Sequence, residues 1–319
     1  MTAAKSTCSI SVIIPVYNGE KTIIPLVNEI VKTLRELYKL EVVLINDASP
    51  DNAEQACISL YEKYPDIVKF YSLAKNVGEH NAVMAGLNQS TGDYMVIVDD
   101  DFQNPISEIV KLLTYATEND FDVTYTYYKR KEHSFFRNLG SSFNDKVANV
   151  MLKKPKDLYL SSFKVLNRFL VNEIIKYDLP FPYIDGLIIR TTSKIGKIEV
   201  AHHKRASGKS GYTLTKLISL WLNAFTNFSI LPLRIAMLAG FCFAVLGFLL
   251  GIYVIIEKLS NPMVPLGYAS LYSVVSIFSG VQLMSIGMIG EYVGRIFISQ
   301  NKRPQYTIRN KYEQECKRV

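Results

Sequence analysis

Two long stretches without charged residues constrain this chain more than any other feature. Residues 235–256 and 269–290 each run for 22 residues without Asp, Glu, Lys or Arg. At ~1.5 Å per residue, a helix of that length crosses a hydrocarbon core of ~30 Å. We therefore expect two transmembrane helices. A pair of helices buried in a protein core is the alternative.

The charges beside these stretches predict their orientation. The loop between them, residues 257–268, is short and has no net charge, whereas Arg234 precedes the first stretch and Arg295 follows the second. Because cytoplasmic loops carry the excess of Lys and Arg, both termini are expected in the cytoplasm. No apolar signal-peptide region lies near the N-terminus, so the large polar domain should stay cytosolic, on the inner membrane.

Most of the net charge of +7 lies after the second stretch, where seven basic and two acidic residues follow Glu291. Such a tail suits anionic lipid or nucleic acid. Because it directly follows a membrane span and contains few aromatic residues, lipid is favoured and no nucleic-acid partner is expected. A solvated tail without a partner is the alternative. The four cysteines are scattered, which disfavours a disulfide or zinc framework.

The N-terminal half alternates between two kinds of segment. Apolar, β-branched runs are expected to be strands, and segments with helical apolar spacing follow them; the strands are 9–16, 41–45, 68–73, 94–98 and 121–128, and the helices 20–37, 52–64, 81–88 and 105–116. This alternation predicts an α/β domain with a largely parallel, doubly wound sheet. The first strand is not followed by GxGxxG, which argues against a dinucleotide-binding domain.

Three adjacent acids, Asp99, Asp100 and Asp101, follow the fourth predicted strand. Ligands of such sheets bind outside the carboxyl ends of the strands, and three neighbouring carboxylates repel one another unless a cation lies among them. Asp99 and Asp101 alternate, so both can point into one space, and Gln103 adds a neutral oxygen. This set suits Mg²⁺ or Mn²⁺ held together with substrate phosphates. A solvated acidic turn before the next helix is the alternative.

Several short motifs resemble one known family. They are VIIPVYN at 12–18, NDASPD at 46–51, NVG at 76–78 with MAG at 84–86, DDDFQNP at 99–105, RASGKS at 205–210, LPLR at 231–234, and GEYVGR at 290–295 followed by Arg303 and Pro304. Together they make the chain similar to inverting family 2 glycosyltransferases of the GT-A fold, and within these to the polyprenyl-phosphate glycosyltransferases. The resemblance implies a metal-dependent enzyme with a mixed GT-A sheet.

The resemblance also implies roles for the residues at matching positions. The nucleotide is expected to contact Pro15, Tyr17, Asp47, Asn76, Gly78, Asp99 and Asp100. The metal is expected on Asp101 and Gln103, and the substrate phosphates on Arg205, Lys209 and Ser210. A packing role for Tyr17 and a solvated basic loop at 205–210 are the alternatives. His80 is expected to be structural.

Two positions depart from the family pattern. Ser162 stands where relatives carry an Asp that is often proposed as the base, and Gly211 stands where a Lys often follows the Ser. A lipid phosphate monoester has a second pKa near ~6, so it needs positioning more than deprotonation. Ser162 and Asp185 are the candidate catalytic positions, Asp185 as an alternative base. A solvated turn acid is the other interpretation of Asp185.

The domain organisation predicted is a cytosolic GT-A catalytic domain (1–211), an interfacial amphipathic helix (212–232), a hairpin of two transmembrane helices (233–291) and a basic cytosolic tail (292–319). The interfacial helix is inferred from apolar residues at helical spacing around Trp221, with core packing as the alternative. Because relatives form tetramers, a homo-oligomer is expected.

The function expected from these features is inverting transfer of a sugar from a nucleotide sugar, with UDP as the expected nucleotide, to a polyprenyl phosphate such as undecaprenyl phosphate. Two other functions remain open. One is transfer to a sugar hydroxyl of a lipid-linked glycan, which would need a base. The other is a membrane scaffold that binds a nucleotide sugar without turnover. The sequence specifies neither the sugar nor the choice between Mg²⁺ and Mn²⁺.

Overall fold

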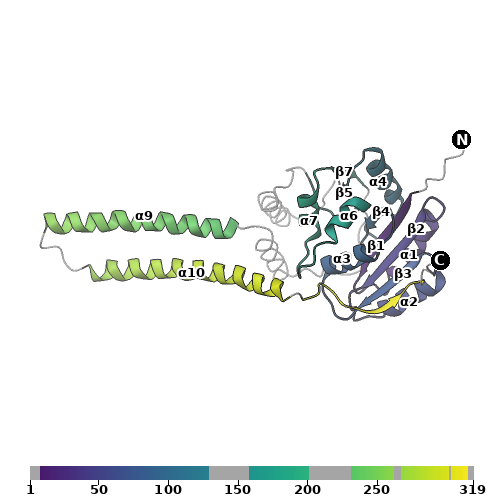
Figure 1. Ribbon diagram of the computed structural model, residues 1–319, viewed down its shortest axis with the longest axis horizontal. Coiled ribbons are helices and arrows are strands. Elements are labelled where there is room, and N and C mark those ends of the chain that lie inside the picture. Colours follow the sequence, from purple (N-terminus) through teal and green to yellow (C-terminus); the bar gives the residue numbers. More distant parts are fainter. Residues whose placement is uncertain (1–7, 129–157, 201–230, 262–266, 302, 315–319) are drawn as a thin grey trace. The chain divides into compact units, whose positions relative to one another are not determined.

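The structure is a computed structural model that describes residues 8–128, 158–200, 231–261, 267–301 and 303–314. The chain divides into two compact units (Figure 1). One unit comprises residues 1–211 together with 302–319, and the other comprises residues 212–301. The first contains a sheet with helices, and the second contains two long helices.

The sheet of the first unit has its strands in the order β7-β5-β6-β4-β1-β2-β3-β8 among the described residues. Their bounds are β1 (Ser9–Val16), β2 (Lys39–Asn46), β3 (Val68–Leu73), β4 (Tyr94–Ile97), β5 (Val123–Tyr127), β6 (Lys164–Asn167), β7 (Ile195–Glu199) and β8 (Ile308–Tyr312). The first four strands pair in parallel, whereas β6 is antiparallel to β4 and β5, and β8 is antiparallel to β3. The predicted mixed, doubly wound sheet is confirmed.

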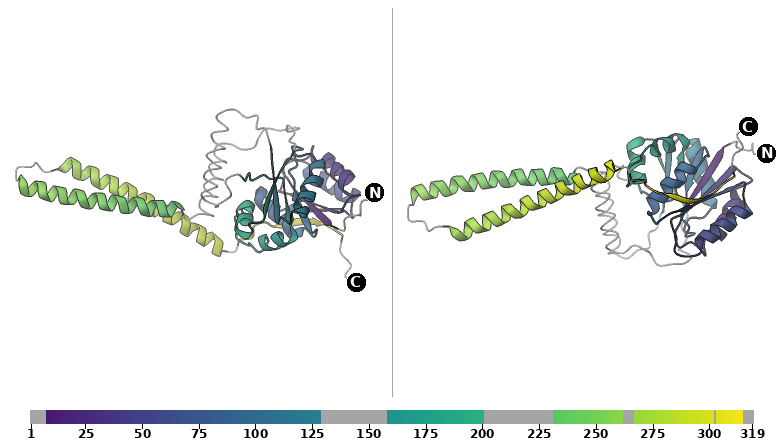
Figure 2. Two further views of the ribbon diagram at one scale, coloured as in Figure 1. Left: turned by 90° about the horizontal axis from the view of Figure 1, so that it is seen from above. Right: turned by 60° about the horizontal axis from the view of Figure 1, so that its bottom comes forward.

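Helices cover both faces of this sheet (Figure 2). One face packs against α1 (Ile23–Leu34), α2 (Ala53–Lys63) and α4 (Ser107–Glu118), and the other against α3 (Glu79–Gln89), α6 (Arg168–Ile174) and α7 (Ile184–Thr191). Alternation along β1 explains the two cores, because Val12 and Ile14 lie in the first and Ile13 lies in the second. The parallel strands are buried on both sides, which is why they read as continuous apolar runs.

The C-terminal segment differs from the expected tail. Residues 292–300 continue the second long helix, and residues 308–312 form β8 at the edge of the sheet beside β3. The hydroxyl of Tyr71 on β3 donates to the carboxylate of Glu313, and the ammonium of Lys311 lies 2.6 Å from Glu313. An edge strand faces solvent on one side, so its charged residues look like a tail in the sequence. Among the described residues of the predicted basic cytosolic tail (292–319), residues 292–300 are thus helical and 308–312 form a strand, and the cytosolic location stays a prediction.

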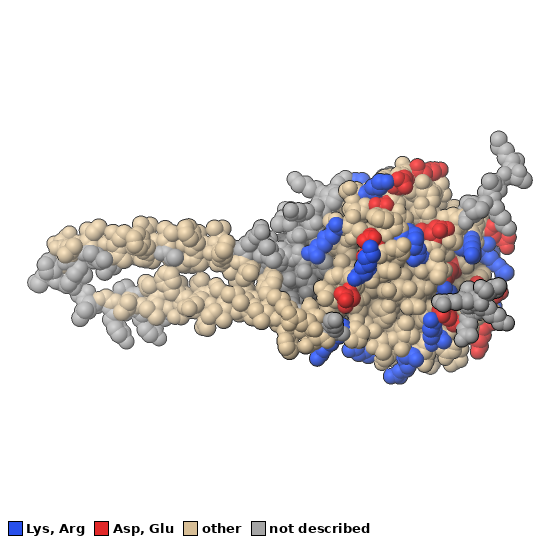
Figure 3. All heavy atoms as spheres, in the orientation of Figure 1, with Lys and Arg blue, Asp and Glu red and all other residues tan. Residues whose placement is uncertain are grey.

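The second unit consists of α9 (Leu231–Ser260) and α10 (Tyr268–Gln300). Both are long and apolar enough to cross a membrane, with candidate spans at Ala236–Tyr253 and Ile277–Gln300. On the face shown in Figure 3, red and blue side chains lie over the sheet unit and are missing along most of the described length of α9 and α10. The two helices contact each other through the rings of Phe243 and Phe278, whose centroids are 6.1 Å apart.

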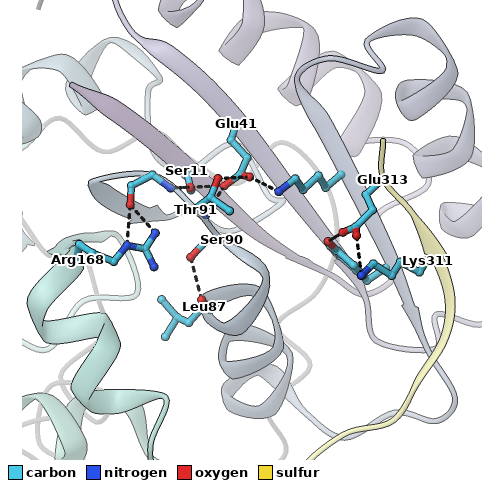
Figure 4. A network of polar contacts seen from close by, with 11 residues as sticks. Ser11, Glu41, Leu87, Ser90, Thr91, Arg168, Lys311 and Glu313 are labelled. Carbon is cyan, nitrogen blue, oxygen red and sulfur yellow. Dashed lines mark hydrogen bonds and ion pairs between the residues drawn. The ribbon is translucent and has the colours of Figure 1, made fainter. Parts of the chain in front are cut away.

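A polar network closes the amino edge of the sheet (Figure 4). The Glu41 carboxylate accepts hydrogen bonds from the side chain of Ser11 and from the backbone and hydroxyl of Thr91, and it lies 2.6 Å from the ammonium of Lys69. The guanidinium of Arg168 donates to the carbonyl of Gly92. These bonds join β1, β2 and β3 to the α3–β4 connection, so this edge is structural.

Candidate active site

The loops at the opposite, carboxyl edge of the sheet share an uncommon backbone conformation. The loops after β1, β2, β3 and β4 each contain one residue with left-handed backbone: Asn18 (φ 59°), Ala48 (φ 49°), Gly78 (φ 88°) and Phe102 (φ 60°). For a residue other than glycine this conformation costs about 1–2 kcal/mol, and such strain gathers at functional sites. The carboxyl edge is therefore the candidate active site, as the topology predicts.

Asp100 and Asp99 point to different sides of the β4–α4 loop. The Asp100 carboxylate lies 3.4 Å from the backbone nitrogen of Tyr17, and a Cβ on Gly19 would lie only 2.5 Å from it. The β1–α1 loop can approach Asp100 this closely only because residue 19 is glycine. Asp99 instead accepts a hydrogen bond of 2.5 Å from the hydroxyl of Ser162.

Asp99 belongs to a group of three carboxylates that includes Asp101 and Glu79. Burial and the neighbouring charge of Glu79 raise the pKa of Asp99 to about 7, with a further contribution from Asp101, against the lowering effect of the Ser162 hydrogen bond. Asp101 is buried, and its carboxylate accepts the backbone N–H of Gln103 at 3.1 Å. Asp99 and Asp101 thus interact as their alternation suggests, and a cation would relieve their repulsion.

The oxygen ligands at this edge fit a divalent cation that is coordinated partly by the protein and partly by a substrate. Within the described residues, no group of three or more His, Cys, Asp or Glu side chains is arranged to hold a metal ion by itself. The predicted ligands, Asp101 and Gln103, supply one carboxylate and one amide oxygen, with Asp99 beside them. Mg²⁺ characteristically binds one or two carboxylates and completes its shell with water and substrate phosphates.

The residues predicted to contact the nucleotide lie at this same edge, but some of their side chains are buried and others are exposed. Asp47 is buried, and its two carboxylate oxygens accept the backbone N–H groups of Val77 at 2.7 Å and Gly78 at 2.9 Å. Burial raises the pKa of Asp47 despite these two hydrogen bonds. In the structure Asp47 therefore holds the β3–α3 loop in place through hydrogen bonds. Tyr17 and Asn76, by contrast, are exposed to solvent. Pro15 is half-buried at the end of β1.

Asp185 lies in a buried ion pair rather than in a solvated turn, so that alternative is wrong. Its carboxylate pairs with the ammonium of Lys164 and accepts a hydrogen bond of 2.8 Å from the hydroxyl of Tyr125. The Lys164 ammonium also lies 5.1 Å from the centre of the Tyr125 ring. Because the carboxylate is already engaged by two donors, a role as base stays a prediction.

Sequence reasoning missed two charged residues at this site, Lys164 and Glu79. Both influence the pKa of Asp99, since Lys164 lowers it and Glu79 raises it. The available signal for Lys164 was a lysine at the start of an apolar run, FKVL, where a buried charge needs a partner. His80 packs edge-on against the ring of Tyr183, and burial lowers its pKa.

Some predicted residues lie outside the part of the chain that the structure describes. These are the proposed phosphate-binding residues Arg205, Lys209 and Ser210, together with Gly211 and most of the proposed interfacial helix. Their roles stay predictions.

Comparison with known proteins gives matches along most of the chain. The sequence model of glycosyl transferase family 2 matches residues 11–175, and that of the GtrB C-terminal hairpin matches residues 231–296. The chain is 31% identical over 306 residues to an undecaprenyl-phosphate 4-deoxy-4-formamido-L-arabinose transferase of Proteus mirabilis, covering 94% of this chain and 92% of the relative.

Solved structures also match the fold. A glucosyl-3-phosphoglycerate synthase of Mycobacterium tuberculosis aligns with a TM-score of 0.50 and 18% identity, covering 70% of this chain and 82% of that one. A complex of the same enzyme with Mn²⁺, UDP and glucosyl-3-phosphoglycerate aligns with a TM-score of 0.48 and 18% identity, covering 70% and 78%.

Proposed function

The chain belongs to glycosyl transferase family 2, and from that premise we propose that it transfers a sugar from a nucleotide sugar to undecaprenyl phosphate. The observation that carries this proposal is a match over 94% of the chain, hairpin included, to a transferase that is named for undecaprenyl phosphate. The carboxyl edge of the sheet supplies acids that could hold the divalent cation of a nucleotide sugar's diphosphate, and the hairpin supplies the membrane association that a lipid acceptor requires.

The proposed reaction is a single displacement. An oxygen of the acceptor phosphate attacks the anomeric carbon of the sugar, and the bond from that carbon to the nucleoside diphosphate breaks with its electron pair on the diphosphate. The anomeric centre is inverted. Because the phosphate oxygen is already ionised near neutral pH, the protein needs to orient it rather than deprotonate it.

The residues at the carboxyl edge divide this work. Asp101 and Gln103 would hold Mg²⁺ or Mn²⁺, an ion that neutralises negative charge on the departing diphosphate. Tyr17 offers an exposed ring to the base. Asp47 keeps the Val77–Gly78 backbone in place, and Asp100 stays against the β1–α1 loop.

The acceptor is better explained as a phosphate than as a sugar hydroxyl. A hydroxyl acceptor needs a general base, and the candidate Asp185 is engaged by Lys164 and Tyr125. Ser162, at the position of the family's Asp, donates to Asp99 and has no carboxylate. Both features favour a nucleophile that arrives as an anion.

We further propose that the reaction occurs on the cytoplasmic side of the membrane. The charge flanking the spans favours the cytoplasmic side for both termini and for the catalytic domain. Undecaprenyl phosphate would then be used in the cytoplasmic leaflet. We keep a homo-oligomer, with a tetramer as the expected form, as part of the proposal.

The test is a donor screen with membranes that contain the full-length protein. Nucleotide sugars are supplied with undecaprenyl phosphate and a divalent cation, and the release of nucleoside diphosphate is measured. The expected result is release that depends on undecaprenyl phosphate, with a labelled lipid product that mild acid cleaves. A product that survives mild acid would indicate a hydroxyl acceptor, and nucleotide-sugar binding without release would indicate a scaffold.

A further inference from the structure

The connection between α6 and α7 exposes large apolar side chains. Leu179 is 40% exposed and Phe181 is 41% exposed, although this unit has extensive apolar cores in which to bury them. Pro180, between them, is partly exposed, and Tyr177 packs against the core at the start of the segment. Residues 177–181 are referred to below as the 177–181 loop. Leu179 and Phe181 are two positions apart, so the loop offers neighbouring apolar side chains to a contacting surface.

This loop is fastened to the segment that follows the second membrane helix. The side-chain amide of Gln305 donates to the carbonyl of Tyr177 at 2.7 Å and to the carbonyl of Leu179 at 2.9 Å. The chain then enters β8 at Ile308, and just before this strand the carbonyl of Thr307 accepts the backbone N–H of Ala74. The backbone of the loop and the segment 303–307 therefore belong to one hydrogen-bonded structure.

Only a short stretch of chain lies between this structure and the last residue of α10. Gln305 lies five positions after Gln300, the last residue of α10, and five steps of extended chain span at most ~18 Å. The apolar surface of α10 continues to Phe297, which is exposed in its last turn. The candidate span also ends at Gln300. The boundary of the membrane is thus expected within reach of the 177–181 loop.

Basic side chains flank the apolar ones. Burial raises the pKa of the Tyr177 hydroxyl, the nearby Arg190 on α7, which is exposed, lowers it, and Asp178, an exposed acid of the loop itself, raises it. Arg303 is exposed two residues before Gln305. Leucine and aromatic side chains next to arginines are the combination found at the headgroup zone of anionic bilayers.

We propose that the 177–181 loop is a membrane-contacting element of the catalytic unit, which inserts Leu179 and Phe181 into the headgroup zone of the bilayer. The lipid surface is the occupant because the loop is tied to the chain that emerges from the membrane. This proposal rests on the membrane association of the proposed function but on neither its sugar nor its acceptor.

The consequence concerns access of the acceptor to the site. Tyr183, two residues after Phe181, packs on His80 in the first turn of α3, and α7 begins with the Ile184–Asp185 pair beside Lys164. A loop held in the headgroups would therefore bring this end of the carboxyl edge close to the phosphate of a membrane-embedded lipid.

The test measures contact with lipid directly in full-length protein in nanodiscs of phosphatidylcholine and phosphatidylglycerol. In a Trp221→Phe background, which removes the chain's one tryptophan, a Phe181→Trp variant is compared with a Leu37→Trp variant. Leu37 is 47% exposed and follows α1, before the amino end of β2. Phosphatidylcholine with a doxyl group on acyl carbon 5 serves as the quencher.

The expected result is quenching at least about twofold stronger for Phe181→Trp than for Leu37→Trp, with blue-shifted emission, because the indole lies in the interfacial zone. Equal quenching of the two variants would overturn the proposal. Blue-shifted emission without lipid quenching would also overturn it, in favour of a second copy of the chain as the occupant. Leu179→Trp repeats the test if Phe181→Trp does not fold. Nucleoside diphosphate release, measured separately, tests the proposed function.

Discussion

Replacing Lys164 by methionine should strongly destabilise the region around the candidate active site. The side chains of Lys164 and Asp185 are only 5% and 11% exposed, and they form an ion pair. Methionine is similar in length and carries no charge, so the variant leaves the Asp185 carboxylate buried with the hydroxyl of Tyr125 as its described donor. Removal of one partner from a buried pair costs about 3–5 kcal/mol.

Replacing both partners should cost less than replacing one. The double variant Lys164→Met with Asp185→Leu removes both charges, and its main defect is the Tyr125 hydroxyl, which loses its acceptor. One unsatisfied buried group costs about 1–3 kcal/mol. A clear deviation from additivity is therefore expected, and it separates a buried pair from two independent residues.

Hydrogen exchange of the full-length protein provides the assay, since it reports the opening of individual segments. Amides of β6 and α7 should exchange roughly 10²–10³-fold faster in Lys164→Met, the factor that corresponds to about 3–4 kcal/mol. The matched control is Lys176→Met, which breaks the Lys176–Glu173 pair at 67% and 38% exposure; such exposed pairs contribute about 0–1 kcal/mol. Similar exchange in the two variants, or additive effects in the double variant, would refute the reasoning.

Three further predictions concern other parts of the catalytic unit. Burial tends to raise the pKa of Glu41, but hydrogen bonds from Lys69, Ser11 and Thr91 outweigh this effect and lower the pKa. The stability that the Glu41 carboxylate contributes should therefore be present above about pH 4.3 and be lost as the pH falls through the lower pKa of the folded state. Glu41→Gln should reduce this loss of melting temperature at acid pH, and an unchanged dependence on pH would contradict the assignment. Ser162→Ala should lower turnover by less than about tenfold, since an anionic acceptor needs no base, and a larger loss would make Ser162 essential. The variant should also move the acid limb of the pH–rate profile to higher pH, because it loses a hydrogen bond that lowers the pKa of Asp99. Tyr71→Phe removes the hydrogen bond to Glu313 and should weaken the β3–β8 pairing by about 1.5–3 kcal/mol, the contribution of a hydrogen bond to a charged group. Hydrogen exchange should then be faster for the β8 amides and unchanged for those of β1.

The elements that the sequence predicted best are those with a local signal. The first four strands are buried on both faces, so their β-branched runs stand out, and the acids after β4 mark the carboxyl edge without any knowledge of contacts. The second long helix was expected for the same kind of reason, because an uncharged stretch of that length is rarely anything else.

The features that the sequence did not reveal depend on partners far away in the chain. Ile308–Tyr312 is short, charged and half-exposed, and it is a strand only because β3 offers an edge to it. The Lys164–Asp185 pair joins residues of two elements that the fold brings together. The hydrogen bonds of Asp47 to Val77 and Gly78 depend on the relative position of two loops, which no local pattern encodes, and its contact with the nucleotide stays a prediction.

The most direct test of metal-assisted transfer at the carboxyl edge is the turnover of Asp101→Asn in membranes that contain undecaprenyl phosphate, the donor identified by the screen and added Mn²⁺ or Mg²⁺. Loss of an electrostatic group that stabilises the transition state typically lowers turnover about 10²–10³-fold, and a loss of that size is predicted. The control is Asp120→Asn, which alters an exposed acid paired with Lys194 and should leave turnover unchanged. Near-native product formation by Asp101→Asn with added metal would contradict the assignment.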